Sequence, residues 1–194
     1  MLACQAPAAM TREIAEPVPA PDISAEHWIN SAPLTLEALR GKVVLVEFWT
    51  FACWNCKNVE PHVKGWHGKF ADKGLTIVGV HTPEFEREKV IENVRAYVKK
   101  NAIAYPIAID NDYVIWRRFH NRYWPALYLI DKEGRIRYTH FGEGSYAQTE
   151  AWIEKLLAEE APQVPKPEMV SGQNEAPTPE ETEEPAPREE ETSE

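Results

Sequence analysis

The sequence predicts one α/β domain in which helices sandwich a mixed β-sheet. Strand-sized apolar runs alternate with helical patterns over the first part of the chain, and this order is typical of parallel strands linked by helices. Two further strands joined by a turn then predict an antiparallel hairpin, and an amphipathic helix follows it. With 194 residues, the chain has room for one ordinary domain with a core.

The predicted elements can be placed in chain order. A short extended piece at residues 28–29 is an N-terminal strand extension, and "KVVLVEFWT" (42–50) is apolar on both faces, as a central strand should be. A helical pattern runs from Cys53 to about Phe70, interrupted by Pro61, and "LTIVGVH" is a second buried strand. A helix over 86–100 places one apolar stripe on the sheet, formed by Val90, Ile91, Val94 and Val98. The remaining elements are the strand "YPIAID" (105–110), a short helix (113–119), a hairpin turning at 131–134 and a last helix (146–157).

The net charge of -10 is concentrated in the C-terminal tail. Residues 161–194 carry ten Glu against two basic residues, seven of the sixteen prolines and no aromatic residue. Such a segment buries too little apolar surface to offset its ordering entropy, so we expect a disordered acidic tail. The predicted organisation is therefore a leader or linker over 1–21, a domain over 22–160 and the tail over 161–194. A near-neutral domain with an acidic tail favours a monomer.

The composition also bears on the classes of partner. No basic patch with interleaved aromatic residues is present, which argues against nucleic acid. No stretch approaches the roughly 18 consecutive apolar residues that a membrane span needs.

Leu2-Ala3-Cys4, followed by a Pro- and Ala-rich stretch, resembles the cleavage box and linker of a bacterial lipoprotein. Cys4 is thus a candidate for lipidation and a lipid anchor, the alternative being an unmodified cysteine in a leader.

Cys53 and Cys56 form a C-x-x-C motif directly after the central strand. A zinc site would require four converging ligands, but His67 would lie roughly 16 Å from Cys56 along the helix. His62 points to a different face of that helix. A metal-binding alternative, such as a copper-handling module, would therefore need a distant ligand from among His81, His120 and His140.

The second interpretation of the motif is a redox pair. Cys53 stands in the first turn of the helix, where unpaired N–H groups and the helix dipole lower a thiol pKa, so it is the predicted attacking thiol. Cys56 lies one turn further on, is more buried, and is the predicted resolving thiol. Glu47, an acid inside an apolar strand, should have a raised pKa and is the predicted proton shuttle. The alternative for Glu47 is a solvated side chain on the outer face of the strand.

These residues and their spacing resemble the thioredoxin superfamily. The shared features are an acid six residues before the first cysteine, the C-x-x-C motif and a proline five residues after the second cysteine. "GKVVLVEFWTFACWNC" and "YWPALYLIDKEGRIRYTHFGEGSY" are similar to the TlpA-like extracytoplasmic branch, and nearest to the thioredoxin-like domain of the DipZ cytochrome c biogenesis proteins. The resemblance covers roughly residues 27–158 and implies a thioredoxin-like fold.

The resemblance also implies roles for residues beyond the cysteines. Pro125 would be the cis-proline that faces the disulfide, and Trp124 would present its backbone to a substrate strand. Trp54, Asn55 and Gly142 would lie in the substrate groove. The Trp54-Asn55 pair departs from the family, in which a proline often stands between the cysteines. The redox potential is therefore not inherited, and since no histidine stands there, we expect a reductant rather than a strong oxidant.

The implied activity is that of a thiol-disulfide oxidoreductase, a protein-disulfide reductase that needs no cofactor beyond its redox-active Cys53–Cys56 disulfide. By resemblance, its place is outside the cytoplasm, its electron donor is a membrane reductant of the CcdA or DsbD kind, and its clients are disulfide-containing proteins such as apocytochrome c or damaged envelope proteins. The alternative activity is a thiol peroxidase, because Thr50-x-x-Cys53 copies part of the peroxiredoxin active turn. Val46 stands where those enzymes keep a proline.

Overall fold

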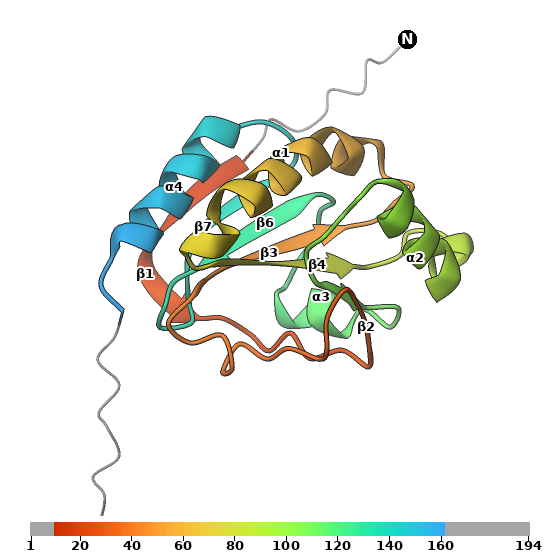
Figure 1. Cartoon of the computed structure of the whole chain (residues 1–194), viewed down its shortest axis with the longest axis horizontal. Coiled ribbons are helices and arrows are strands. Elements are labelled where there is room, and N and C mark those ends of the chain that lie inside the picture. The colour runs from red at the N-terminus through yellow and green to blue at the C-terminus, as the bar shows by residue number, and fades with distance from the viewer. Residues whose placement is uncertain (1–9, 162–194) are drawn as a thin grey trace, which may run out of the picture. The chain divides into compact units, whose positions relative to one another are not determined.

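A computed structural model describes residues 10–161, which form one mixed β-sheet with helices on both faces (Figure 1). The strands in this part of the chain are β1 (Met10–Pro19), β2 (His27–Ile29), β3 (Val43–Trp49), β4 (Leu75–His81), β5 (Ile107–Ile109), β6 (Ala126–Ile130) and β7 (Arg135–Phe141). The helices are α1 (Trp54–Phe70), α2 (Ile91–Lys100), α3 (Val114–Arg118) and α4 (Tyr146–Ala158), with short 3-10 turns η1 (Ala71–Lys73) and η2 (Glu86–Glu88). The strand order is β1-β7-β6-β3-β4-β5-β2, so the predicted α/β, thioredoxin-like fold is confirmed.

Strand β3 lies at the centre of the sheet and determines where the site is built. It pairs in parallel with β4 and antiparallel with β6, and all seven of its residues are buried. Because side chains alternate along a strand, Val44, Val46 and Phe48 enter one core while Leu45 and Trp49 enter the other. Glu47 shares the parity of Leu45 and Trp49, so it faces the same side of the sheet as those residues.

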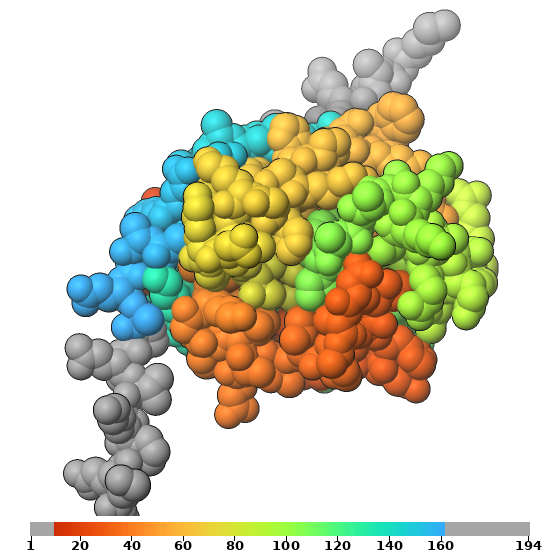
Figure 2. Space-filling model, viewed as in Figure 1, coloured from red at the N-terminus to blue at the C-terminus, as the bar shows by residue number. Residues whose placement is uncertain are grey.

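The two faces of the sheet are covered differently. Apolar residues of α1, α2 and α4 pack on the Leu45 face, where α1 and α4 form a continuous layer in front of the sheet (Figures 1 and 2). The opposite face is covered by α3 and by the segment 20–41, which contributes Ile23, Leu36 and Leu39 to the core. The sandwich therefore places the carboxyl end of β3 against the start of α1, where the C-x-x-C motif lies.

The structure corrects the boundary of the predicted leader. Residues 10–19 form β1, which pairs antiparallel with β7 and carries an irregularity between Glu13 and Val18. The linker prediction over 1–21 is wrong for this stretch, because edge-strand pairing depends on backbone hydrogen bonds that tolerate exposed polar side chains and proline. Cys4 and residues 162–194 of the acidic tail lie outside the described residues, so the predictions for them remain predictions.

Two helices also differ from the sequence pattern. The predicted helix over 86–100 is divided into η2 and α2, and Val90 is an exposed N-cap rather than part of the buried stripe. In contrast, α1 continues through Pro61, although proline removes one helical hydrogen bond. None of the helices between residues 10 and 161 is both long and apolar enough to cross a bilayer.

Candidate active site

Cys53 is the N-cap of α1 and lies directly after the end of β3. Its backbone is extended, with φ -69° and ψ 120°, and its sulfur accepts a hydrogen bond from the Cys56 N–H at 3.2 Å. The hydrogen bond from the Cys56 side chain is the main cause that lowers the pKa of Cys53, against an opposing effect of burial. The side chain is partly exposed and both thiols are free, so Cys53 can reach another molecule as a thiolate.

Cys56 has the opposite environment one helical turn further on. It is buried in the core beneath α1, and burial together with the neighbouring Cys53 raises its pKa well above the ordinary value. A thiol of this kind stays protonated until its partner has reacted and a base is available. The pair thus consists of one accessible, acidic thiol and one buried, protonated thiol.

Glu47 lies beneath the dithiol, on the face of β3 that α1 covers. Its side chain is buried, with only 2% of the residue exposed, and burial raises its pKa to about 8. The Tyr105 hydroxyl donates to Glu47 Oε2 at 3.1 Å and opposes this shift. The carboxyl therefore changes its protonation near neutrality, as a proton shuttle requires. The alternative of a solvated Glu47 does not fit this burial.

The predicted groove residues Pro125 and Gly142 lie in the loop before β6 and directly after β7. The Trp124–Pro125 peptide bond is cis, and Pro125 is buried. The Gly142 N–H donates to the Pro125 carbonyl at 2.9 Å, and Gly142 has a φ of +86°, a conformation that glycine adopts without strain. The predicted groove residues Pro125 and Gly142 are thus adjacent, and this hydrogen bond links the loop before β6 to the end of β7.

The aromatic residues near the motif divide into exposed and buried ones. Trp54 is 72% exposed and Asn55 is exposed beside it, so both are available for contact with a client. Trp124 is half-buried, donates through Nε1 to the Thr82 carbonyl at 3.1 Å, and packs on the Trp116 ring. Trp49 belongs to the core.

Two acids close to the site were not predicted from the sequence. Glu60, one turn after Cys56, accepts a hydrogen bond from the Tyr97 hydroxyl at 2.9 Å, and its charge helps to raise the pKa of Glu47. Glu88, predicted only as part of a helix, is fully buried and bonded to the turn that precedes Cys53. The sequence pattern of a helix does not indicate that one of its polar residues, here Glu88, is buried by contacts with a distant loop.

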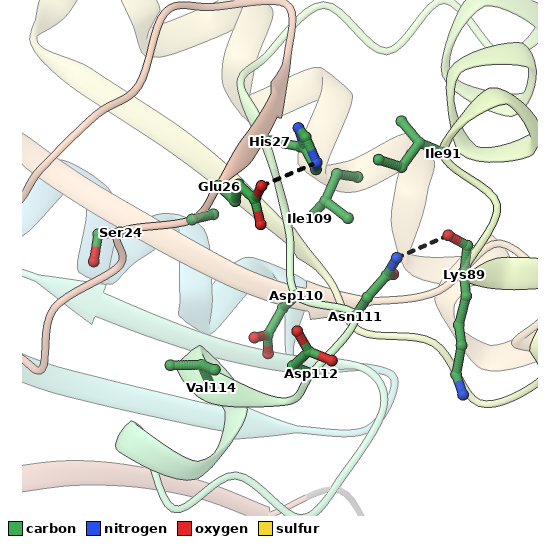
Figure 3. Close-up of a pocket in the computed structure, with 11 residues that line it drawn as sticks. Ser24, Glu26, His27, Lys89, Ile91, Ile109, Asp110, Asn111, Asp112 and Val114 are labelled. Atoms are coloured by element: carbon green, nitrogen blue, oxygen red, sulfur yellow. Dashed lines mark hydrogen bonds and ion pairs between the residues drawn. The ribbon is translucent and has the colours of Figure 1, made fainter.

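The structure provides no arrangement of metal ligands in the described part of the chain. Between residues 10 and 161, no group of three or more His, Cys, Asp or Glu side chains is placed to hold a metal ion. A separate hollow lies between β2, the end of β5 and α3, and Figure 3 shows Glu26, His27 and Asp110 among its lining residues. None of the predicted site residues lines this hollow.

The fold and the dithiol define the class of thioredoxin-like thiol-disulfide oxidoreductases. Residues 18–139 match the model described as the AhpC/TSA family, and the chain belongs to this family.

The chain is also similar to individual proteins. It is 46% identical over 156 residues to Protein DipZ of Mycobacterium tuberculosis, covering 78% of this chain and 22% of DipZ. It is 30% identical to the thiol-disulfide oxidoreductase YkuV of Bacillus subtilis, covering 73% of this chain and 95% of YkuV. A crystal structure of a thioredoxin-like superfamily protein superposes with a TM-score of 0.70 at 31% identity, covering 74% of this chain and 99% of that one. The chain thus spans about a fifth of DipZ and nearly all of YkuV.

Proposed function

We propose that this chain reduces disulfides of extracytoplasmic proteins, in cytochrome c maturation or envelope repair. The observation that carries the proposal is the unequal environment of the two thiols: Cys53 is partly exposed with a lowered pKa, and Cys56 is buried with a raised pKa. Attack on a disulfide requires one accessible thiolate, and release of the product requires a second thiol protected from other reactions.

The exchange proceeds in two steps. The Cys53 thiolate attacks one sulfur of the client disulfide, the client S–S bond breaks, and the other client sulfur leaves as a thiolate that takes up a proton. Cys56 then loses its proton to Glu47 and attacks the Cys53 sulfur, which frees the second client thiol and forms the Cys53–Cys56 disulfide. Two electrons pass from the chain to the client. Glu47 lies beneath the pair and titrates near neutrality, which suits it to this transfer.

The surroundings of the dithiol favour a polypeptide client. Trp54 is exposed between the cysteines, and an exposed aromatic side chain supplies apolar contact area at low entropic cost. Pro125 and Gly142 are joined by a backbone hydrogen bond, and we assign binding of the client to Trp124, Pro125 and Gly142 together with Trp54 and Asn55. A chain that had lost its electrons to a client would need recharging, for which we propose a membrane reductant of the CcdA or DsbD kind.

The cellular location of the protein and its membrane anchor are part of the same proposal. The similarity to DipZ and the sequence around Cys4 support a place outside the cytoplasm, with Cys4 as a lipidation site. We propose that the chain acts as a monomer, because an exchange reaction of this kind needs only one dithiol.

A thiol peroxidase is less well supported by the geometry. Such an enzyme would use the Thr50 hydroxyl to bind a peroxide beside Cys53, but this hydroxyl donates to the Glu88 carboxylate. Its other neighbour is His81 Nε2, at 3.3 Å. The hydroxyl is buried and already bonded, so it is not free to position a peroxide.

The proposed activity predicts that the reduced chain accelerates the reduction of insulin disulfides by dithiothreitol, because a preformed thiolate attacks faster than a free thiol. The rate is followed by the turbidity of the released insulin B chain. In parallel, consumption of hydrogen peroxide is measured for Cys56→Ser, which keeps Cys53 alone. Rapid peroxide consumption together with no insulin reduction would refute the proposal and support the peroxidase alternative.

A further inference from the structure

Glu88 is a buried carboxylate that the exchange mechanism does not use. The residue is 0% exposed, and its two oxygens accept hydrogen bonds from two separate segments. Oε1 accepts from the Thr50 hydroxyl and from the Ala52 N–H at 2.8 Å, and Oε2 accepts from the N–H groups of Glu84 at 2.8 Å and Phe85 at 2.9 Å. Although burial opposes ionisation, these hydrogen bonds lower the pKa of Glu88. The side chain is thus a fully bonded anion that joins two loops.

One of these loops is bonded directly to Cys53. The Cys53 N–H donates to the Thr50 carbonyl at 3.3 Å, and the Thr50 backbone lowers the pKa of the Cys56 thiol against the larger effect of burial. Thr50 therefore holds Cys53 through its backbone while its side chain is bonded to Glu88. Any movement of the turn from Thr50 to Ala52 moves the Cys53 sulfur relative to the first turn of α1.

The other loop is fixed at both ends. We call residues 82–89 the Glu88 loop. At its start, the Thr82 carbonyl accepts a hydrogen bond from Trp124 Nε1 at 3.1 Å, which links the loop to the segment before β6 that contains the cis bond. At its end, the Lys89 carbonyl accepts from Asn111 Nδ2 at 2.7 Å (Figure 3). The loop is therefore a support against which Glu88 can hold the turn.

We propose that Glu88 is a positioning residue for disulfide exchange: it fixes the turn from Thr50 to Ala52 against the Glu88 loop and so keeps the Cys53 sulfur where the Cys56 N–H stabilises its thiolate. This inference rests on the proposed function, but the property that it concerns, the ionisation of Cys53, is measured without any client. Glu88 acts through the backbone and does not touch a substrate.

Other groups facing Cys53 must be considered in a test based on pH. These groups are Cys56 on α1, Glu47 on β3 and Glu84 in the Glu88 loop. His81 lies beside Thr50, and burial lowers its pKa to about 4, so it stays neutral over the range in which Cys53 titrates. Substituting Glu88 leaves all of these groups in place.

Glu88→Gln is the most direct variant because it keeps the size of the side chain. Two backbone N–H groups donate to Oε2 of Glu88, and a backbone N–H cannot act as an acceptor. The carbonyl oxygen of the Gln side chain should therefore take the Oε2 position. The Gln amino group then faces Thr50 and Ala52. The Thr50 hydroxyl can rotate and accept, but the Ala52 N–H is left opposite another donor, and the turn before Cys53 loosens.

The test is the pH dependence of Cys53 alkylation by iodoacetamide in the reduced full-length chain, with mass spectrometry of the Cys53 peptide to separate it from Cys4. We expect Glu88→Gln to slow alkylation below the wild-type pKa by roughly tenfold, which corresponds to a rise of about one pKa unit. Thr50→Val, which removes one donor, should shift the pKa less and in the same direction. Glu86→Gln is the matched control, because Glu86 is an exposed acid of the same loop whose carboxylate pairs with Lys89.

The outcomes separate positioning from a purely structural role. A Glu88→Gln variant that melts at a lower temperature but keeps the wild-type Cys53 pKa would overturn the inference, as would an equal shift in Glu86→Gln. If Glu88→Gln does not fold, Thr50→Val decides, and an unchanged pKa in that variant would also overturn it. A wild-type chain that fails to reduce insulin while Glu88→Gln raises the Cys53 pKa would refute the proposed function and leave the positioning effect standing.

Discussion

Cys53→Ser is expected to abolish insulin reduction, with a loss of at least about a thousandfold, because no other described thiol is exposed at a helix N-terminus. A serine hydroxyl is a far weaker nucleophile at neutral pH and cannot form the mixed disulfide. The rate of insulin precipitation measures this loss. The fold should persist, since the substitution changes one partly exposed atom.

Cys56→Ser provides the contrasting result. The attacking Cys53 thiolate remains, so the first step still proceeds, but no buried thiol is left to release the client. We expect a mixed disulfide between the variant and its client, visible on a non-reducing gel and lost on addition of dithiothreitol. Equal trapping by Cys53→Ser, or equal turnover in the two variants, would contradict the assigned roles.

Glu47→Gln is expected to become increasingly stabilising as the pH rises. The folded pKa of Glu47 is about 8, above the ordinary value of 4.5, so between these two pH values the folded chain retains a proton that the unfolded chain has lost. The stabilisation from this protonated carboxyl is complete below pH 4.5 and is lost as the pH rises through about 8. Over this pH window, the free energy of unfolding of Glu47→Gln should rise relative to that of the wild type by at most about 3 to 5 kcal/mol.

The measurement is urea unfolding of wild type and variant at several pH values between 5 and 9, analysed as the difference between the two chains. Taking the difference cancels the contribution to the free energy of unfolding of the titratable groups that both chains share. Glu92→Gln, which changes an exposed acid on α2, should follow the wild type at every pH. A Glu47→Gln difference that does not vary with pH would mean that the carboxyl is not desolvated in the folded state.

The central part of the fold could be predicted because its signals are local. The run from Val43 to Trp49 is apolar on both faces and is buried on both faces. Glu47 was identified for the same reason, since an acid in such a strand has no solvent to face. The C-x-x-C motif at the start of a helical pattern likewise predicted the accessible Cys53 and the buried Cys56.

Other features depend on contacts between residues far apart in the sequence. Strand β1 exists through its pairing with β7, and its own side chains carry little apolar pattern. Glu88 is bonded to Thr50 and Ala52, which lie 38 and 36 residues before it, so no local pattern could indicate its burial. Pro125 was found only through the resemblance to a family motif.

The reduction potential of the Cys53–Cys56 couple tests the central claim most directly. The chain is equilibrated with glutathione or dithiothreitol buffers of known potential, and the fraction of free thiols is determined by alkylation and mass spectrometry. If the chain is a protein-disulfide reductase, we expect a strongly reducing potential, roughly -270 mV as in thioredoxin. A value near roughly -120 mV, as in DsbA, would contradict the account and identify the chain as an oxidant that introduces disulfides.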